Sequence, residues 1–178
     1  AGISADDIPV VAFSVGEEEL SGLDTSNLVG HLAAWNYFQS ADVGANTEWV
    51  AAWKARMGDE RVTNDPMEAH YIGFNMWAQA VEQAGTTNID AVRQAMYGQE
   101  VPNLTGGIAV MNTNHHLSKP VLIGEIQDDG QFATVWETDG VVVGDAWSDF
   151  LPESAKLTAD WTYPWVCGNC EKPKYVTN

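Results

Sequence analysis

Carboxylates are the side chains in this sequence with the clearest chemical potential. Glu17 follows a short apolar run, and Asp65 lies beside Pro66 at the predicted start of a helix. Two carboxylates on either side of a scissile bond can act as general acid and base, and carboxylates also accept hydrogen bonds from the N–H groups of a ligand. Nothing in the spacing of Glu17 and Asp65 places them across a reacting bond. We therefore expect them to bind a ligand without catalysing a reaction.

The common catalytic motifs are absent from the sequence. It contains no P-loop, no Gly-x-Gly-x-x-Gly, no Gly-x-Ser-x-Gly elbow and no His-Glu-x-x-His. His115 and His116 are adjacent, and neighbours on a strand point to opposite faces, so they form a poor metal pair. Ser, Asp and His show no spacing that indicates a catalytic triad. The sequence predicts no enzyme activity, no cofactor and no metal site.

Two cysteines lie near the end of the chain, Cys167 and Cys170, in a Cys-x-x-Cys pattern. This pattern occurs in redox dithiols, as half of a zinc site and in small disulfide loops. No second Cys-x-x-Cys is present to complete a four-thiolate zinc site. We therefore favour a structural disulfide between Cys167 and Cys170.

Polar and aromatic residues gather where the predicted elements begin and end. Residues 8–13 form an apolar run of strand length, the three glutamates of residues 17–19 indicate a helix start, and residues 31–38 are a second strand candidate. In α/β folds, ligands bind at the carboxyl ends of strands and at helix starts. The junction residues are Ser14, Val15, Glu17, Trp35, Asn36, Tyr37, Asn64, Asp65 and Glu68. For Asp65 and Glu68 the favoured alternative is a helix-capping role.

Three helices follow. Asn46 is a candidate N-cap for a helix to about Met57, with Trp49 and Trp53 facing the core because they recur at helical spacing. In the second helix Asp65 is the predicted N-cap, Pro66 the first helical residue and Glu68 the end of a capping box. Its predicted inward face is Met67, Tyr71, Phe74, Ala78 and Val81, and Gly85 ends it. A third helix over residues 88–97 should place Ile89, Val92 and Met96 inward.

Three strands are predicted after the helices. Residues 107–111 form one, and residues 121–126 and 132–136 form a hairpin around the turn Asp128, Asp129 and Gly130. The order of strands and helices indicates an α/β or α+β fold.

The composition narrows the class of partner. The chain has 178 residues, 8 Lys and Arg against 25 Asp and Glu, and a net charge of −17. Such a field repels phosphate backbones and anionic lipids, so we expect no nucleic-acid partner. The 45% of hydrophobic residues suffices for a core. No apolar run approaches the roughly 20 residues that span a bilayer, and the first residues lack the basic start of a secretory signal.

Four stretches together resemble the C-terminal half of the urea-binding proteins of bacterial ABC transporters. They are residues 8–20 (IPVVAFSVGEEEL), 28–38 (LVGHLAAWNYF), 61–69 (RVTNDPMEA) and 114–136 (NHHLSKPVLIGEIQDDGQFATVW). These proteins belong with the branched-chain amino acid and amide receptors in the type I periplasmic binding-protein family. The resemblance implies a partial type I fold of class α/β, in which this C-terminal half contributes to two lobes that close on a ligand.

The resemblance also implies a division of the chain. Residues 1–30 would be part of lobe 2, residues 31–40 a crossover, and residues 41–105 part of lobe 1. Residues 106–150 would return to lobe 2 with the hairpin, and residues 151–178 would be a C-terminal tail. The N-terminal half of the same protein would be a further partner, and apolar helix faces should then be exposed or covered by it.

The implied function is capture of urea or a short-chain amide for a membrane permease, in the periplasm or outside the cell, with membrane association through the transporter. Urea needs acceptors for its N–H groups, a donor for its oxygen and a flat aromatic wall. Glu17 and Asp65 are the candidate acceptors, and the N–H groups near Gly16 are the candidate donors. Trp35 or Tyr37 could be the aromatic wall. The candidate ligand-binding residues are Ser14, Val15, Gly16, Glu17, Trp35, Tyr37, Asn64, Asp65 and Glu68.

Three alternatives to the urea receptor stay open. The first is a cytoplasmic amide sensor of the same fold that regulates transcription through a partner protein. The second is a receptor for branched-chain amino acids. The third is an amidohydrolase, which only the carboxylates favour.

Overall fold

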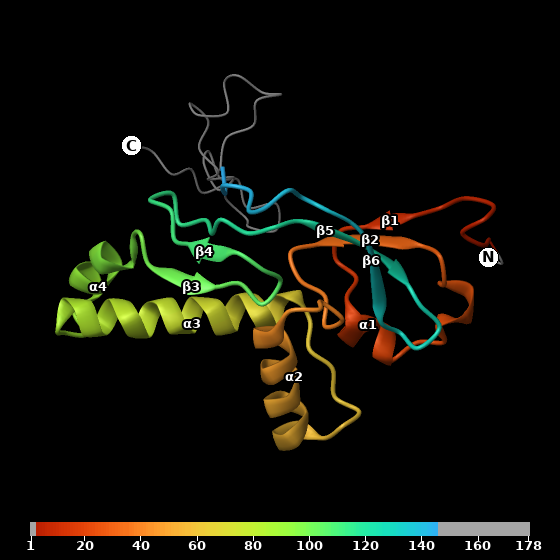
Figure 1. Ribbon diagram of the computed structural model, residues 1–178, viewed down its shortest axis with the longest axis horizontal. Coiled ribbons are helices and arrows are strands. Elements are labelled where there is room, and N and C mark those ends of the chain that lie inside the picture. The colour runs from red at the N-terminus through yellow and green to blue at the C-terminus, as the bar shows by residue number, and fades with distance from the viewer. Residues whose placement is uncertain (1–2, 146–178) are drawn as a thin grey trace, which may run out of the picture. The chain divides into compact units, whose positions relative to one another are not determined.

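The strands and helices follow the predicted order, with one added strand. The computed structural model describes residues 3–145 (Figure 1). The elements are β1 (Val11–Ala12), α1 (Glu17–Ser21), the 3₁₀ turn η1 (Thr25–Asn27), β2 (Leu32–Trp35), α2 (Gly44–Met57), α3 (Asp65–Ala84), α4 (Ile89–Met96), β3 (Glu100–Pro102), β4 (Ile108–Val110), β5 (Leu122–Ile126) and β6 (Phe132–Glu137). The predicted disulfide between Cys167 and Cys170 lies outside the described residues.

A four-stranded sheet in the order β1-β2-β5-β6 carries the first core. β1 pairs with β2 in parallel, and the other two pairs are antiparallel. Alternate residues of a strand share a face, so Leu122 and Ile126 of β5 both point into the core. There they pack with Leu20 of α1, Ala33, Phe38 and Phe132, and the rings of Phe38 and Phe132 stack with centroids 4.4 Å apart.

The hairpin between β5 and β6 is confirmed. Gly130 adopts a positive φ of 75°, which glycine reaches without the strain that a Cβ would cause. The Asp129 carboxylate accepts a hydrogen bond from the N–H of Gln131 at 2.9 Å and closes the turn. The Asp-Gly signal in the sequence therefore predicted both the place and the type of connection.

The start of α3 differs from the prediction by one residue. Asn64, and not Asp65, is the N-cap, and its side-chain oxygen accepts the N–H of Met67 at 3.2 Å. Asp65 and Pro66 are the first two helical residues. The Glu68 carboxylate binds Lys119 instead of completing a capping box. The capping interpretation of Asp65 and Glu68 is therefore wrong, although a cap exists at the neighbouring position.

The buried face of α3 also differs from the prediction. The buried residues recur every four positions, and they are Glu68, Ile72, Met76 and Ala80. Of the predicted face, Tyr71 is exposed and Phe74 is 59% exposed, whereas Met67, Ala78 and Val81 are half-buried. The helix is apolar on two faces, so periodicity alone selected the wrong one. The exposed aromatic face agrees with the expectation that helix faces are left uncovered by this part of the chain.

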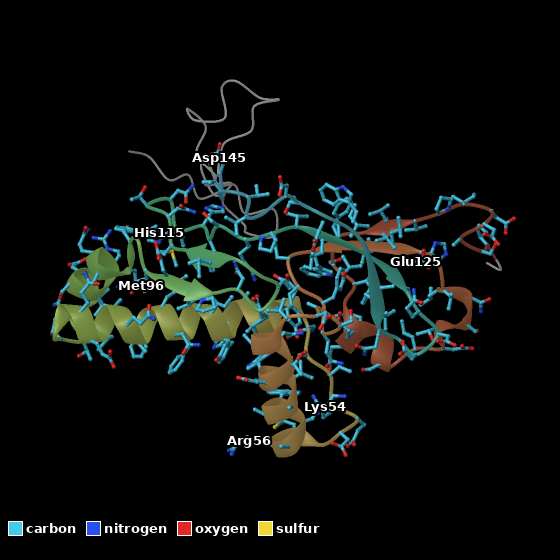
Figure 2. The ribbon with its side chains drawn as sticks, viewed as in Figure 1. Lys54, Arg56, Met96, His115, Glu125 and Asp145 are labelled. Atoms are coloured by element: carbon cyan, nitrogen blue, oxygen red, sulfur yellow. The ribbon has the colours of Figure 1, made fainter. Side chains whose placement is uncertain are left out.

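α2 begins earlier than predicted, at Gly44, with Val43 as its N-cap residue. Asn46 is not the cap. It lies in the first turn, buried, and its amide donates to the carbonyl oxygens of Gln39 and Ala41. The predicted core positions Trp49 and Trp53 are only half-buried, although the ring of Trp49 packs against those of Tyr37 and Tyr71. Lys54 and Arg56 lie in its last turn (Figure 2), where their positive charges interact favourably with the negative end of the helix dipole.

α4 and a small second sheet pack against α3 (Figure 1). Asn88, where the predicted helix begins, is the N-cap of α4, and its side chain accepts the N–H of Ala91. Val92 is buried as expected, whereas Ile89 is 82% exposed, so its predicted inward position is wrong. β3 was not predicted, since three residues ending in Pro102 show no strand period. It pairs with β4, and Val101 and Ala109 cover the buried face of α3.

The division into lobes stays a prediction. Two observations on the sheets bear on its boundaries. β1, β2, β5 and β6 share one sheet, which joins residues predicted for lobe 2 and for the crossover. β4 pairs with β3, so the second sheet crosses the predicted boundary after residue 105. Among the described helices, none is long and apolar enough to cross a membrane.

Candidate ligand-binding site

The structure brings the three predicted junctions together at Gly16. The indole N–H of Trp35 donates to the carbonyl oxygen of Val15 at 2.7 Å. A Cβ at position 16 would lie 3.5 Å from the Cβ of Asn64 and 4.0 Å from the indole nitrogen of Trp35. The turn after β1, the end of β2 and the start of α3 therefore meet at one point. A Cβ there would be in ordinary van der Waals contact with Asn64 and Trp35, and its tightest neighbour would be Glu19 Oε2 at 3.3 Å.

Glu17, the residue after Gly16 and the first of α1, is 1% exposed. Its Oε1 accepts the N–H of Gln39 at 2.6 Å, and its Oε2 has no hydrogen-bond partner within residues 3–145. Burial raises the pKa of Glu17 to about 7, and the nearby carboxylates of Asp65 and Glu19 act in the same direction. Near neutral pH this side chain therefore exists in both protonation states.

Asp65 holds the chain that leaves β2. Its Oδ2 accepts the N–H of Asn36 at 2.9 Å. Burial raises the pKa of Asp65, and the ammonium group of Lys119 and the N–H groups of Asn36 and Tyr37 oppose this effect. The Asp65 carboxylate thus accepts a hydrogen bond from the main chain of the segment after β2 and does not cap its own helix.

Glu68 and Lys119 form a buried ion pair. Glu68 is fully buried, and its second oxygen, Oε1, has no hydrogen-bond partner in the described part of the chain. Burial raises the pKa of Glu68 despite the opposing charge of Lys119. The pair joins the first turn of α3 to the segment before β5, and its partners are 51 residues apart in the sequence. Glu68 therefore supports the site from the interior.

Tyr37 is fully buried, and its hydroxyl contacts Asn46 Oδ1 at 2.8 Å and Thr63 Oγ1 at 2.7 Å. Burial raises the pKa of its hydroxyl. The ring has no open face on which a ligand can stack in the described structure. Trp35, which is half-buried, is the better candidate for an aromatic wall.

Residues that the sequence interpretation missed complete the site. Gln39 donates its main-chain N–H to Glu17, accepts the N–H of Thr63 at 2.7 Å through Oε1, and donates its amide to Gln131. The side chain of Asn36 donates to the carbonyl oxygen of Pro120 at 2.6 Å. Gln39, Thr63 and Lys119 carry no local signal, although Lys119 is one of only eight basic residues.

The site is therefore arranged in two layers. Ser14, Val15 and Trp35 are exposed or half-buried, and Gly16 and Asn64 lie close behind them. Beneath them, Glu17 and Asp65 accept main-chain N–H groups. Tyr37 and Glu68 bind side chains instead, those of Asn46 and Lys119. The cations near this group are already paired, Lys119 with Glu68 and Arg61 with Glu18.

The histidines lie elsewhere. His115 is in the loop between β4 and β5 (Figure 2), and its Nε2 contacts the hydroxyl of Tyr97 at 2.7 Å. Among the described residues, no three His, Cys, Asp or Glu side chains come close enough to hold a metal ion. An open groove of about 800 Å³ runs along β6 and residues 40–43, and none of the predicted site residues lines it.

Comparison with known proteins defines the class. A family profile described as "Periplasmic binding protein domain" matches residues 1–153, and the chain therefore belongs to this family. Its fold is the type I fold of substrate-binding proteins of ABC transporters, in part. A solute-binding protein from Rhodopseudomonas palustris, crystallised with 3,4-dihydroxybenzoic acid, shares 18% identity with a TM-score of 0.65 over 75% of this chain and 38% of that one.

Two further proteins are similar in different ways. An amino acid ABC transporter substrate-binding protein from Pseudomonas fluorescens shares 20% identity and a TM-score of 0.60 over 81% of this chain and 39% of that chain. A Geobacillus stearothermophilus protein named "Limonene hydroxylase" is 34% identical over 110 residues, which are 62% of this chain and 20% of that protein. The chain thus spans about two fifths of the solved structures and a fifth of the curated relative.

Proposed function

We propose that this chain is part of the solute-binding component of an ABC importer, which captures urea or a short-chain amide between two lobes. The family and the type I fold support the binding role. The four sequence stretches that resemble urea-binding proteins support the choice of ligand. The protein would act in the periplasm or outside the cell, deliver its ligand to a membrane permease and perform no chemistry.

The paired cations are the observation that carries the choice of a neutral ligand. A cationic side chain strengthens the binding of a carboxylate such as that of a benzoate or an amino acid. Near the candidate site, Lys119 and Arg61 are engaged by Glu68 and Glu18. Urea carries no charge, and its four N–H donors match a site rich in oxygen acceptors. The solved relatives crystallised with aromatic acids need not share this preference, since their identity to the chain is below a quarter.

Recognition would begin at the outer layer. Ser14 would offer a hydroxyl and Trp35 a flat wall that excludes water. The N–H of Gly16, which the sequence suggested as a donor, already donates to Glu19 Oε2 at 2.8 Å. The inner carboxylates Glu17 and Asp65 would fix this geometry and provide acceptors when the lobes close. Closure then shifts the population toward the form that the permease recognises.

Isothermal titration of the full-length protein with urea, acetamide, leucine and benzoate tests the proposal. We expect heat of binding with urea, weaker binding of acetamide, and none with leucine or benzoate. Binding of leucine without urea would instead favour the branched-chain amino acid receptor. Release of ammonia from acetamide would contradict the absence of chemistry and favour an amidohydrolase.

An amide sensor of the same fold is the remaining alternative. It would also bind urea or acetamide, so titration does not separate it from a transport protein. Fractionation of the source cells does, because the importer component should be recovered outside the cytoplasmic membrane. Recovery with cytoplasmic proteins would favour the sensor.

A further inference from the structure

β1 is an edge strand of the four-stranded sheet, with β2 as its one neighbour among the described residues (Figure 1). The two strands are parallel, and Val11 and Ala12 pair with Leu32 and Ala33. The C=O of Val10 accepts the N–H of Leu32 at 2.9 Å. Successive residues of a strand direct their main-chain groups to opposite sides. Val11 therefore directs its N–H and C=O away from β2, to the open edge.

The side chains along this edge are apolar and open to solvent on both faces of the sheet. Val10 and Val11 are 52% and 44% exposed, and as neighbours in an extended segment they point to opposite faces. Phe13, directly after β1, is 75% exposed. Near-continuous apolar runs such as residues 8–13 are typical of strands in parallel sheets, which other elements cover on both faces. β1 therefore has the sequence of an interior strand and the surroundings of an edge strand.

The apolar surface continues from β1 onto the next two strands, on the face turned away from the first core. The register aligns Val11 with Leu32 and Ala34 with Ile123. Side chains that are aligned in this way share a face. None of these four residues belongs to the first core, which takes the alternate residues of the same strands. An apolar face thus lies beside the open edge of β1.

The opposite edge of the sheet, at β6, has different chemistry. Thr134 and Glu137 give this strand polar side chains, and the hydroxyl of Ser40 donates to the C=O of Phe132. Residues 8–13 at the β1 edge carry no charge and no polar side chain. Natural proteins charge, shorten or cover an open edge, because its unpaired main-chain groups otherwise pair with another strand. We therefore expect the edge of β1 to be covered in the full-length protein.

The length of the solved relatives indicates what covers it. About three fifths of each of these proteins lies outside the part that matches this chain. A parallel neighbour needs a crossover of a dozen or more residues, and a segment of that length supplies both the crossover and the strand. Pro9 has no N–H to donate, so the pairing is expected to begin at Val11.

We propose that a strand of the N-terminal half of the full-length protein pairs in parallel with β1 along its open edge. The N–H and C=O of Val11 form hydrogen bonds with this strand. The elements that accompany it cover Val10 and Phe13 and remove them from water, which stabilises the contact. The proposal does not depend on which solute the protein binds.

Amide hydrogen exchange of the full-length wild-type protein, followed by NMR, tests the pairing. The control is Thr134 of β6. The N–H of Gln127 donates to the C=O of Gln131, so by alternation along β6 the N–H of Thr134 points to the other open edge. We expect the N–H of Val11 to exchange at least about 100-fold more slowly than that of Thr134. Equal rates would overturn the proposal, and so would protection of Val11 that is lost on dilution, which would assign the edge to a second copy.

Phe13→Lys in the full-length protein tests the cover. A charge placed in a covered position should lower the melting temperature by more than about 5 °C. Val135→Lys is the control, because Val135 is 54% exposed and lies at the other edge, on β6, and it should shift the melting temperature by less than about 2 °C. Small and equal shifts would mean that the edge of β1 is open to solvent and would overturn the proposal. If Phe13→Lys does not fold, the exchange rates of the wild-type protein decide the matter.

Discussion

Glu17, Asp65 and Glu68 are three acidic side chains in the interior, and Lys119 is the cation that faces two of them. Burial raises the pKa of all three carboxyls. An ionised group in a protein interior needs partners, and here main-chain N–H groups of the segment after β2 supply some of them. The carboxylates therefore fix the backbone beneath the candidate site at a cost in stability that depends on pH.

The first prediction concerns this pH dependence. The pKa of Glu17 is about 7 in the fold, against an ordinary value of 4.5. Between these values the unfolded chain has lost the proton while the folded chain retains it, so stability falls as pH rises through this window. The difference corresponds to roughly 3 kcal/mol. Glu17→Gln should therefore gain up to about that amount relative to wild type between pH 5 and pH 8.

Calorimetric unfolding of full-length wild type and variant at the two pH values measures this gain. Glu18→Gln is the control, because it removes the same charge from an exposed position. An equal gain in Glu18→Gln would assign the effect to net charge and not to burial of Glu17.

The second prediction concerns the ion pair of Glu68 with Lys119. Lys119→Met leaves the Glu68 carboxylate buried without its cation and should cost about 3–5 kcal/mol in the free energy of unfolding. Adding Glu68→Gln removes the unpaired charge and should restore about half of this loss or more. Thermal unfolding of the single and double variants measures both. If the double variant is no more stable than Lys119→Met, the loss comes from packing.

At the scale of elements, the start of α3 is where most of the site is built. Asn64 caps the helix, Asp65 holds the segment after β2, and Glu68 holds the segment before β5. Sequence signals predicted a helix start here within one residue. They did not predict that the carboxylates of its first turn bind other segments, because those partners come from elsewhere in the chain.

The third prediction follows from the role of Asp65. Asp65→Ala removes the acceptor of the Asn36 N–H and should weaken urea binding by the full-length protein about tenfold or more, the usual effect of losing a charged hydrogen-bond partner. Asp90→Ala removes a matched first-turn acid from α4 and should leave urea affinity unchanged. Isothermal titration measures both. Unchanged affinity in Asp65→Ala, with only a loss of stability, would limit Asp65 to a structural role.

The fourth prediction concerns the close packing of β5. A Cβ at Gly124 would lie 2.7 Å from the ring of Phe38 and 2.9 Å from Phe132 Cβ. Gly124→Ala should therefore destabilise the fold by about 1–3 kcal/mol through overpacking. Gly44→Ala at the start of α2 meets no atom within 4 Å and should be neutral or slightly stabilising. Thermal unfolding distinguishes the two, and equal melting temperatures would show that the rings of the core move aside easily.

At the scale of the whole molecule, the exposed aromatic face of α3 matters most. Tyr71, Phe74 and Trp77 are all exposed in the described structure. The chain covers about two fifths of its solved relatives. We propose that the N-terminal half of the full-length protein covers this face and completes the first lobe.

The fifth prediction tests this cover. Phe74→Lys in the full-length protein should lower the free energy of unfolding by about 3 kcal/mol or more, as expected for a charge placed in a core. Val135→Lys changes a similarly exposed residue on β6 and should stay within about 0.5 kcal/mol. Thermal unfolding measures both variants. A neutral Phe74→Lys would mean that the face remains open to solvent.

The sequence by itself determined the α/β class, the hairpin and the C-terminal ends of α2 and α3. Those features depend on neighbours in the chain, such as the turn at Gly130 and the stop of α3 at Gly85. The tertiary structure decided which face of α3 is buried and which partners the carboxylates take. The pair of Glu68 and Lys119 spans 51 positions, and no local propensity encodes a contact of that length. The convergence of Trp35 and Asn64 on Gly16 likewise exists only once the sheet and α3 are packed together.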